Sequence, residues 1–454
     1  VQEVGGRAAV LLQNNGALPL RHNLRSLVLI GKASQVYVQQ AVAGGAVVGE
    51  PMGAGGGSSD VVPHYTVSPV DGLRHALAEL GNGAASVRLI LVDDANSSAT
   101  IDGKPASFDD VLAAAGGAES VVMMAGTISE EGADRASFTD KSGKALAAPA
   151  ALGGGLDWYA ARSNTIATAS GDNQAKNSGP VAMIERIMAA RSTTARAMAA
   201  KTVLVLKDNA GVALPSSLVG SKGPAILEAW FPGQEDGNIV ADALFGRINP
   251  SGKLPVTVPF VGKGFLDSAT PAQFPGIVSA DGKLQTVTYS EQLAIGYRWY
   301  DANAGGGCAP RAGVNPCVAF PFGHGLSYTS FAIGKPALAQ DKASGTWRAS
   351  VKVSNTGKRE GAEVVQAYLG LPAAADRVGA KQPPRRLVGF QRLALNPGQA
   401  GEVSITIDPK ASNHPMSVWD EQAHRWVMPK GRYTLWLGRS SSPRDLQVAG
   451  YIDQ

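Results

Sequence analysis

The chain of 454 residues is long enough for two or three domains, at about 100–200 residues each. Hydrophobic residues make up 44% and charged residues 17%, a balance that excludes an intrinsically disordered chain. The net charge of +4 is small and the Lys and Arg residues are scattered, so nothing indicates a nucleic-acid partner. No apolar run approaches the roughly 20 residues that a membrane-spanning helix needs, so no membrane partner is expected either.

The beginning of the chain lacks an initiator Met and the charged-then-apolar layout of a signal peptide. Val4, Ala8, Leu11 and Leu12 would share one face of an amphipathic helix. The sequence therefore predicts a helix at the start, within a linking segment of residues 1–23.

Short β-rich runs alternate with helical runs over residues 24–260. The expected strands are apolar runs at Leu27–Ile30, Val87–Val92, Val121–Met124 and Thr202–Leu206. The expected helices cover residues 70–80, 108–115, 181–191 and 238–245. This alternation predicts an α/β sandwich domain with a largely parallel sheet, whose strands end along one edge.

The segment Thr127–Arg135 follows one of these strands and contains two adjacent carboxylates, Glu130 and Glu131. Strand ends in α/β sheets are where sites are built, and a Glu held there could act as a general acid if its surroundings raise its pKa. The alternative is a solvated acidic loop with a salt bridge between a carboxylate and Arg135.

Residues 139–180 are dominated by small and polar residues, with Leu156–Tyr159 as the only large apolar group. A stretch of this length without regular structure inside a domain is usually functional or mobile. Trp158 and Tyr159 could form an aromatic wall for a sugar ring. Alternatively, the pair anchors the loop to the core.

After about residue 335 the hydrophobic period changes to two, as in the alternation of Ala349, Val351 and Val353 with polar residues. Turn sequences such as Asn355–Gly357 separate the alternating runs. The pattern predicts a fibronectin type III-like β-sandwich over residues 335–454, preceded by a loop-rich connecting segment at 261–334.

The two cysteines, Cys308 and Cys317, lie in a loop rich in Gly and Pro that could close a disulfide easily. A disulfide would indicate an oxidising compartment, although two free thiols are an alternative that the spacing leaves open. No His or Cys cluster has the spacing of metal ligands, so neither a metal nor another cofactor is expected.

Several motifs, in their order along the chain, resemble glycoside hydrolase family 3. They are Ala8–Leu20, Gly55–Ser59 with Thr66–Pro69, Ala229–Glu235, Phe245–Pro259, Ile295–Asp301 and Phe320–Thr329. Each motif alone is weak, but together they span nearly the whole chain. The resemblance implies an (α/β)6-type sandwich domain followed by a fibronectin III-like domain, which are the two regions expected above.

The resemblance also implies an N-terminal (β/α)8 barrel that carries a nucleophilic Asp, and this chain contains no such segment. We therefore expect the barrel, in the same precursor or in another chain, to be a partner of this chain. The family's acid/base lies in a Glu-Gly-x-Asp-Arg context, which corresponds here to Glu131–Arg135 and points to Glu131 as the catalytic residue. In similar enzymes the first Ser after the glycine-rich loop lies close to the sugar, which points to Ser58. The alternative for that loop is a structural turn.

The function that the resemblance implies is that of a retaining exo-β-glycosidase, most simply a β-glucosidase, acting on a terminal β-linked sugar of an oligosaccharide or glycoside. A β-xylosidase or another exo-glycosidase of the same family is the first alternative. A non-catalytic carbohydrate-binding or interaction module is the alternative of another class, and such a module would not need a carboxylic acid at Glu131. We expect the protein to be periplasmic or secreted, and without its nucleophile this chain alone should be an incomplete enzyme.

Overall fold

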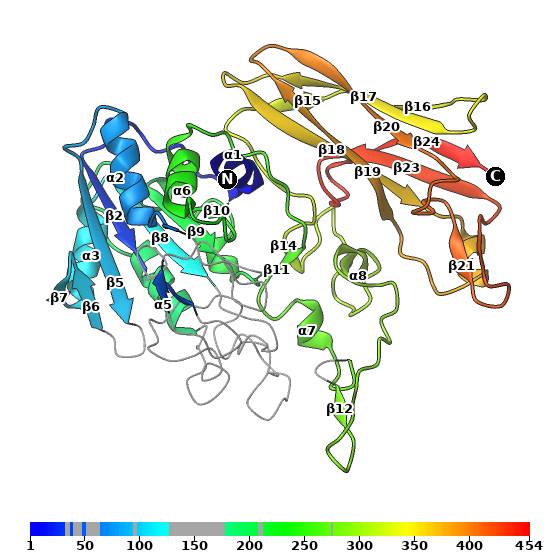
Figure 1. Ribbon diagram of the computed structural model, residues 1–454, viewed down its shortest axis with the longest axis horizontal. Coiled ribbons are helices and arrows are strands. Elements are labelled where there is room, and N and C mark those ends of the chain that lie inside the picture. The colour runs from blue at the N-terminus through cyan, green and yellow to red at the C-terminus, as the bar shows by residue number, and fades with distance from the viewer. Residues whose placement is uncertain are drawn as a thin grey trace. The chain divides into compact units, whose positions relative to one another are not determined.

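The computed structural model describes residues 1–31, 37–39, 48–50, 64–93, 98–126, 178–207, 212–273 and 276–454. It contains two compact units (Figure 1), of which the first comprises Val1–Gly252 and Pro259–Val287. The second comprises Lys253–Val258 and Thr288–Gln454. The expected connecting segment at 261–334 is thus divided between the two units.

The first unit contains an eight-stranded sheet with the strand order β1-β10-β9-β8-β2-β5-β6-β7. Its strands are β1 (Val10–Gln13), β2 (Ser26–Ile30), β5 (Ser86–Asp93), β6 (Ser98–Ile101), β7 (Lys104–Ala106), β8 (Ser120–Gly126), β9 (Thr202–Lys207) and β10 (Ala225–Glu228). The consecutive strands β10, β9, β8, β2 and β5 are parallel. The strands at both edges of the sheet are antiparallel.

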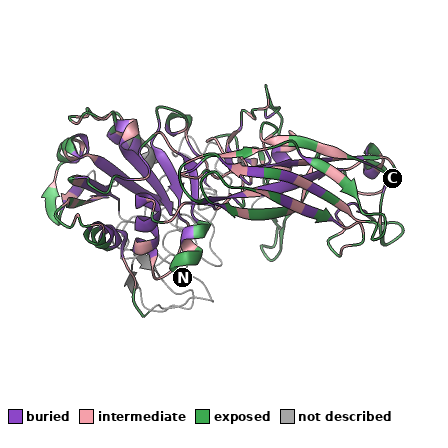
Figure 2. Ribbon diagram, turned by 90° about the horizontal axis from the view of Figure 1, so that it is seen from above, coloured by how far each residue is buried: buried purple, intermediate pink, exposed green. Residues whose placement is uncertain are grey.

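Every residue of β9 and β10 is buried, as are residues 120–125 of β8 and Leu27–Ile30 of β2 (Figure 2). Burial of successive residues requires cover on both faces of the sheet, because side chains alternate between the faces. The continuous apolar runs in the sequence therefore correspond to strands that are covered on both faces, as the α/β prediction assumed.

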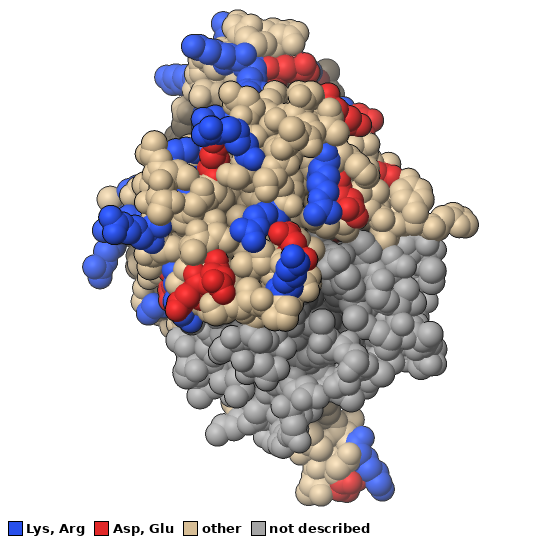
Figure 3. All heavy atoms as spheres, turned by 90° about the vertical axis from the view of Figure 1, so that its left-hand side faces the viewer, with Lys and Arg blue, Asp and Glu red and all other residues tan. Residues whose placement is uncertain are grey.

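The helices of the first unit are α1 (Gln2–Ala8), α2 (Pro69–Glu79), α3 (Phe108–Gly117), α5 (Ser178–Met188), α6 (Asp236–Phe245) and α7 (Phe265–Ser268). Two-stranded sheets pair β3 (Tyr37–Gln39) with β4 (Val48–Glu50) and β12 (Ile277–Val278) with β13 (Gln285–Thr286). On the face shown in Figure 3, Lys and Arg side chains are interspersed with Asp and Glu.

Helices α2 and α6 pack against each other through glycines. Helix α2 begins with Pro69 in its first turn, after Ser68, whose hydroxyl accepts the Asp71 N–H. A Cβ atom on Gly237 of α6 would lie 2.0 Å from the Ser68 carbonyl oxygen. Glycine is therefore required for this backbone approach, which fixes the start of α6 against α2.

The expected strands and helices of the first unit are all present, with ends that differ by at most a few residues. The opening helix is the exception, because α1 ends at Ala8 and Leu11 and Leu12 lie in β1. All residues of β1 are buried beside β10, whereas an amphipathic helix buries only one face. The edge hairpin of β6 and β7 was also not expected from the sequence.

The second unit is dominated by a β-sandwich. One sheet contains β15 (Phe331–Ile333), β16 (Ala337–Gln340), β17 (Trp347–Asn355) and β20 (Ala400–Ile407). The other has the order β19-β18-β23-β24, with β18 (Gly361–Gly370), β19 (Arg386–Leu395), β23 (Arg432–Gly438) and β24 (Leu446–Asp453).

The sandwich core confirms the predicted period of two. Ala349, Val351 and Val353 of β17 are buried and pack with alternate residues of the other strands, such as Val403 of β20 and Leu435 of β23. Side chains at every second position of both sheets thus meet in one apolar layer.

The remainder of the second unit consists of short elements. They are β11 (Val258–Pro259, where the chain returns to the first unit), α8 (Tyr297–Asp301), β14 (Val318–Phe320), β21 (Val418–Asp420) and β22 (Arg425–Val427). Within the part of the chain that the structure describes, every helix is too short or too polar to cross a bilayer.

Candidate active site

The parallel strands of the first unit reverse their direction of winding between β2 and β8. Among the parallel strands, β2 comes first along the chain and β5 lies on one side of it, whereas β8, β9 and β10 follow in order on the other side. Open α/β sheets bind ligands beyond the carboxyl ends of the strands that flank such a switch point. We call this region the carboxyl edge and define it by the last residues of four strands: Ile30, Gly126, Lys207 and Glu228.

The two sequence segments expected to form the site follow the two strands at the switch point. Glu131 follows the last residue of β8 by five positions, and the glycine-rich segment with Ser58 lies in the connection after β2. Glu131, Ser58 and Trp158 themselves lie outside the described residues. The structure therefore describes the strands that lead into these segments, and the roles of Glu131, Ser58 and Trp158 remain predictions.

A fully buried ion pair occupies the carboxyl edge beside the end of β8. Lys207 is the register partner of Gly126, and its ammonium group lies 2.5 Å from Oδ1 of Asp236. Both side chains are completely inaccessible to solvent. Burial raises the pKa of Asp236 to about 6, although the Lys207 ammonium opposes this shift.

The second carboxylate oxygen of Asp236, Oδ2, is buried and has no hydrogen-bond partner. Asp236 is the first residue of α6, where the helix dipole favours a negative charge. An unpartnered buried oxygen is costly, and such atoms in native proteins are concentrated at functional sites. Within the described residues, the hydrogen-bonding capacity of the Asp236 carboxylate at the carboxyl edge is therefore not fully used.

The segment before Asp236 is held by a second set of polar contacts. The Tyr65 hydroxyl donates to Glu235, whose other oxygen accepts from the Asn238 amide at 2.6 Å. The hydrogen bond from Tyr65 lowers the pKa of Glu235, so this carboxyl stays ionised at neutral pH. The Val67 backbone N–H donates to the Gln234 carbonyl at 2.9 Å, and the Gly237 N–H donates to the Val67 carbonyl at 2.8 Å, which adds a further connection to the segment that leads into α2.

The turn after β10 contains a residue in an unusual backbone conformation. Trp230 has a φ of 57°, which is uncommon for a residue other than glycine. The backbone N–H of Trp230 donates to the buried carboxylate of Glu228 at 2.9 Å. A side chain of the carboxyl edge thus stabilises a strained turn, a feature typical of functional sites.

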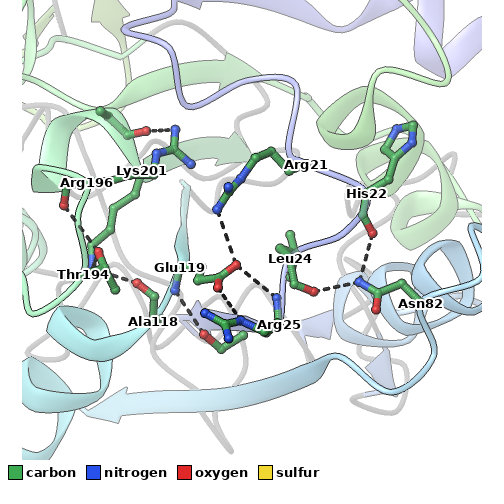
Figure 4. Close-up of polar contacts among 12 residues, drawn as sticks. Arg21, His22, Leu24, Arg25, Asn82, Ala118, Glu119, Thr194, Arg196 and Lys201 are labelled. Carbon is green, nitrogen blue, oxygen red and sulfur yellow. Dashed lines mark hydrogen bonds and ion pairs between the residues drawn. The ribbon is translucent and has the colours of Figure 1, made fainter.

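The opposite end of the sheet, which we call the amino edge and define by Glu119 and Lys201, is closed by hydrogen bonds (Figure 4). The buried Lys201 ammonium donates to the carbonyl oxygens of Ala115, Gly116 and Ala118 at 2.7–3.0 Å. Two of these carbonyls belong to the C-terminal turn of α3, where a cation is favoured.

Glu119 completes the amino edge on its exposed side. Its carboxylate accepts the Arg25 guanidinium at 2.9 Å and the Arg25 backbone N–H at 3.1 Å, and Arg21 lies 3.4 Å away. The backbone N–H of Arg25 is the main cause that lowers the pKa of Glu119. Every charged group here has a partner, so the amino edge is structural.

Cys308 and Cys317 form a disulfide in the second unit, with their Cα atoms 5.3 Å apart. The structure therefore contains the bond that the loop composition predicted. Among the residues that the structure describes, no group of His, Cys, Asp and Glu side chains could hold a metal ion.

The sequence reasoning missed Lys207 and Asp236. The available signal was a charged residue at the end of an otherwise apolar strand, together with an acidic residue at the start of a helix. Neither observation identifies the other residue as its partner, since 29 positions separate them.

Comparisons with known proteins agree with the α/β unit and the β-sandwich described above. Residues 9–175 and 174–328 match the Glycosyl hydrolase family 3 C-terminal domain, and residues 363–441 match a fibronectin type III-like domain. The matches to the first of these cover well over half of the chain, so the chain belongs to glycoside hydrolase family 3.

Several proteins similar in sequence to this chain are named as β-glucosidases. Probable beta-glucosidase J of Aspergillus fumigatus is 40% identical over 238 residues, which are 51% of this chain and 24% of that protein. Beta-glucosidase B of Emericella nidulans is 38% identical over 247 residues, or 53% of this chain and 26% of that protein. The chain thus spans about a quarter of the length of these relatives.

Solved structures match over the whole chain. Beta-glucosidase 3B from Thermotoga neapolitana, solved in complex with alpha-D-glucose, has a TM-score of 0.67 and 25% identity. The match covers 100% of this chain and 53% of that protein. The combination of an α/β sheet unit and a fibronectin III-like sandwich is therefore shared with known β-glucosidase structures.

Proposed function

We propose that this chain is the part of a retaining β-glucosidase that supplies the acid/base carboxyl group, Glu131. One observation carries the proposal: the segments with Glu131 and Ser58 follow β8 and β2, the two strands that flank the switch point. The family membership and the names of the relatives support the same reaction class.

The chemistry of a retaining glycosidase divides between two carboxyl groups about 5–5.5 Å apart. Glu131 would donate a proton to the glycosidic oxygen while a nucleophilic Asp attacks the anomeric carbon. Glu131 would then accept a proton from the water that hydrolyses the glycosyl-enzyme ester. The family resemblance implies that the Asp comes from a barrel domain, which would be the main partner of this chain.

Substrate contacts from this chain would come from the glycine-rich segment and the segment after Glu131. Ser58 would hydrogen-bond a hydroxyl of the terminal sugar, and Trp158 would present an aromatic face to the ring. The disulfide between Cys308 and Cys317 supports a location in the periplasm or outside the cell, where such bonds persist.

The test uses a polypeptide that carries the barrel together with this chain, and compares Glu131→Gln with Glu130→Gln. Glu131→Gln should slow hydrolysis of a disaccharide by about 10²–10⁴-fold, because the poor leaving group needs a proton. Aryl glycosides with good leaving groups should still form the glycosyl-enzyme, and azide should restore turnover with a β-glycosyl azide as product.

Glu130→Gln is the matched control and should retain activity near that of the wild type. The opposite pattern, with Glu130 essential and Glu131 dispensable, would assign the acid/base role to the neighbouring residue. Full activity in both variants would remove the acid/base role from this segment.

A further inference from the structure

The second unit contains a cavity of about 160 Å³ between α8, the loop closed by Cys308–Cys317 and a turn of the sandwich at residues 441–444. All its lining residues belong to this unit. For comparison, an engineered cavity of about 150 Å³ accommodates benzene, so the space suits one six-membered ring.

Helix α8 provides a rigid wall with a hydroxyl group. The Tyr297 ring stacks on Phe322 with centroids 4.7 Å apart and meets Tyr368 edge-on at 5.9 Å. The Tyr297 hydroxyl accepts the Leu387 N–H at 2.7 Å, which leaves its own proton for donation. The aromatic wall is thus fixed before any ligand arrives.

A carboxylate at the end of α8 also lines the cavity. Both oxygens of Asp301 are bound by the Arg385 guanidinium, at 2.8 and 3.2 Å, and both side chains are largely buried. Each oxygen retains a lone pair that can accept a hydroxyl proton. Because Arg385 balances its charge, Asp301 offers a hydrogen-bond acceptor without requiring a cationic ligand.

Thr257 contributes an unsatisfied group to the same cavity. Its Oγ1 atom is buried and has no hydrogen-bond partner. An apolar ring would leave this hydroxyl unsatisfied, at a cost that a ligand with its own hydroxyl groups would remove. Two further hydroxyls, on Ser441 and Ser442, lie on the wall formed by the sandwich turn.

The remaining wall is the disulfide-closed loop, which is held at two points. The Asn315 amide donates to the Tyr300 carbonyl at 3.4 Å, and Arg444 Nε donates to the Ala312 carbonyl at 3.1 Å. Val314 and Pro310 give this wall an apolar surface. A loop fixed in advance reduces the entropy cost of binding.

We propose that this cavity binds a single pyranose ring, with Thr257, Tyr297 and Asp301 contacting its hydroxyl groups. The size selects one ring, the hydroxyl and carboxylate groups select a polyhydroxylated ring, and the balanced charge of Asp301 selects a neutral one. The proposal concerns binding by the second unit and does not depend on the proposed catalytic role of Glu131.

The test is calorimetric titration of this chain with methyl β-D-glucopyranoside, and with cyclohexanol as an apolar ring of similar size. The wild type should bind the glucoside saturably in the millimolar range and cyclohexanol more weakly. Val314→Trp should fill the cavity mouth and weaken binding at least about tenfold, and the fold should tolerate it because Val314 is 40% exposed. Thr257→Val should weaken binding about three- to tenfold, with Thr406→Val on an exposed strand position as the control.

Two results would overturn the proposal. In the first, the wild type shows no saturable binding, which means that the cavity holds water only. In the second, Val314→Trp binds normally while Glu131→Gln does not, which places the sugar at the proposed catalytic segment and leaves the proposed function intact. Melting curves of all variants establish that each remains folded.

Discussion

Two buried lysines mark the two ends of strand β9, and the fold treats their charges differently. Lys201 at the amino edge donates to three backbone carbonyls, so its charge is fully solvated by the protein. Lys207 at the carboxyl edge pairs with Asp236, whose Oδ2 is buried without a partner and whose pKa is raised to about 6. The contacts at the amino edge therefore stabilise the sheet. The buried ion pair at the carboxyl edge is less favourable for stability, and it lies where a site is expected.

The largest expected effect comes from separating the members of the buried ion pair. Asp236→Leu should lower the free energy of unfolding of the first unit by about 3–5 kcal/mol, because the buried Lys207 ammonium would lose the carboxylate that it contacts at 2.5 Å. The double variant Lys207→Met/Asp236→Leu should recover most of this loss. Native-state hydrogen exchange of the β8 and β9 amides measures the free energy of unfolding of the first unit separately from that of the second.

A double variant as unstable as Asp236→Leu alone would show that the pair is required for stability. The contrast between the two edges would then disappear. A stable double variant that loses hydrolytic activity in the barrel-containing polypeptide would sharpen the contrast.

The amino edge should respond differently, since Lys201 has no acidic partner to remove. Lys201→Met leaves three carbonyl oxygens without their donor and should cost about 2–3 kcal/mol by the same exchange measurement. Lys222→Met, at an exposed position, should change stability by less than about 0.5 kcal/mol. Equal effects of the two substitutions would contradict the structural role of Lys201.

Acid should also change the stability contributions of the two edges in opposite directions: that of Asp236 at the carboxyl edge should increase, and that of Glu119 at the amino edge should decrease. Asp236 has a folded-state pKa raised to about 6, so between that pH and its unfolded-state pKa the folded protein binds more protons than the unfolded chain. Its contribution to stability therefore rises as pH falls from 7 to 5, by about 1 kcal/mol. The stability difference between the wild type and Lys207→Met/Asp236→Leu, measured at both pH values, checks the sign. No change, or a shift in favour of the double variant at pH 5, would contradict the assignment.

The smallest effect is expected at Glu119. Glu119→Gln should cost only about 0.2–1 kcal/mol, because Arg25 is 90% exposed in its side chain and water screens the pair. The lowered pKa of Glu119 means that its contribution is present at neutral pH and is lost as pH falls through the folded-state value. Urea titrations of the wild type and Glu119→Gln at pH 7 and in mild acid measure the cost of the substitution and its dependence on pH. A loss above about 2 kcal/mol would show that the exposed pair is stronger than exposed ion pairs generally are.

The sequence predicted the elements whose signals are local. Apolar runs such as Thr202–Leu206 identified the buried strands, and alternation such as Ala349, Val351 and Val353 identified the sandwich. The first helix was extended too far, because Leu11 and Leu12 suit a helix and a buried strand equally well.

The site was predictable only in part. The position of the Glu131 segment after a buried strand could be predicted, since a strand end is a sequence feature. The Lys207–Asp236 pair could not, because it depends on how α6 packs against α2 through Gly237 and on which strand lies beside β8. Such contacts are set by tertiary packing and leave no periodic signal.

The route of the chain between the units has a consequence for how the protein can be divided. Residues 253–258 belong to the second unit, yet residues 259–287 return to the first. A gene fragment that ends at any single position within this stretch removes a piece of one unit or leaves a piece of the other attached. Exchange of the sandwich between relatives at a single crossover point would therefore damage a unit, so an engineered exchange should transfer both units together.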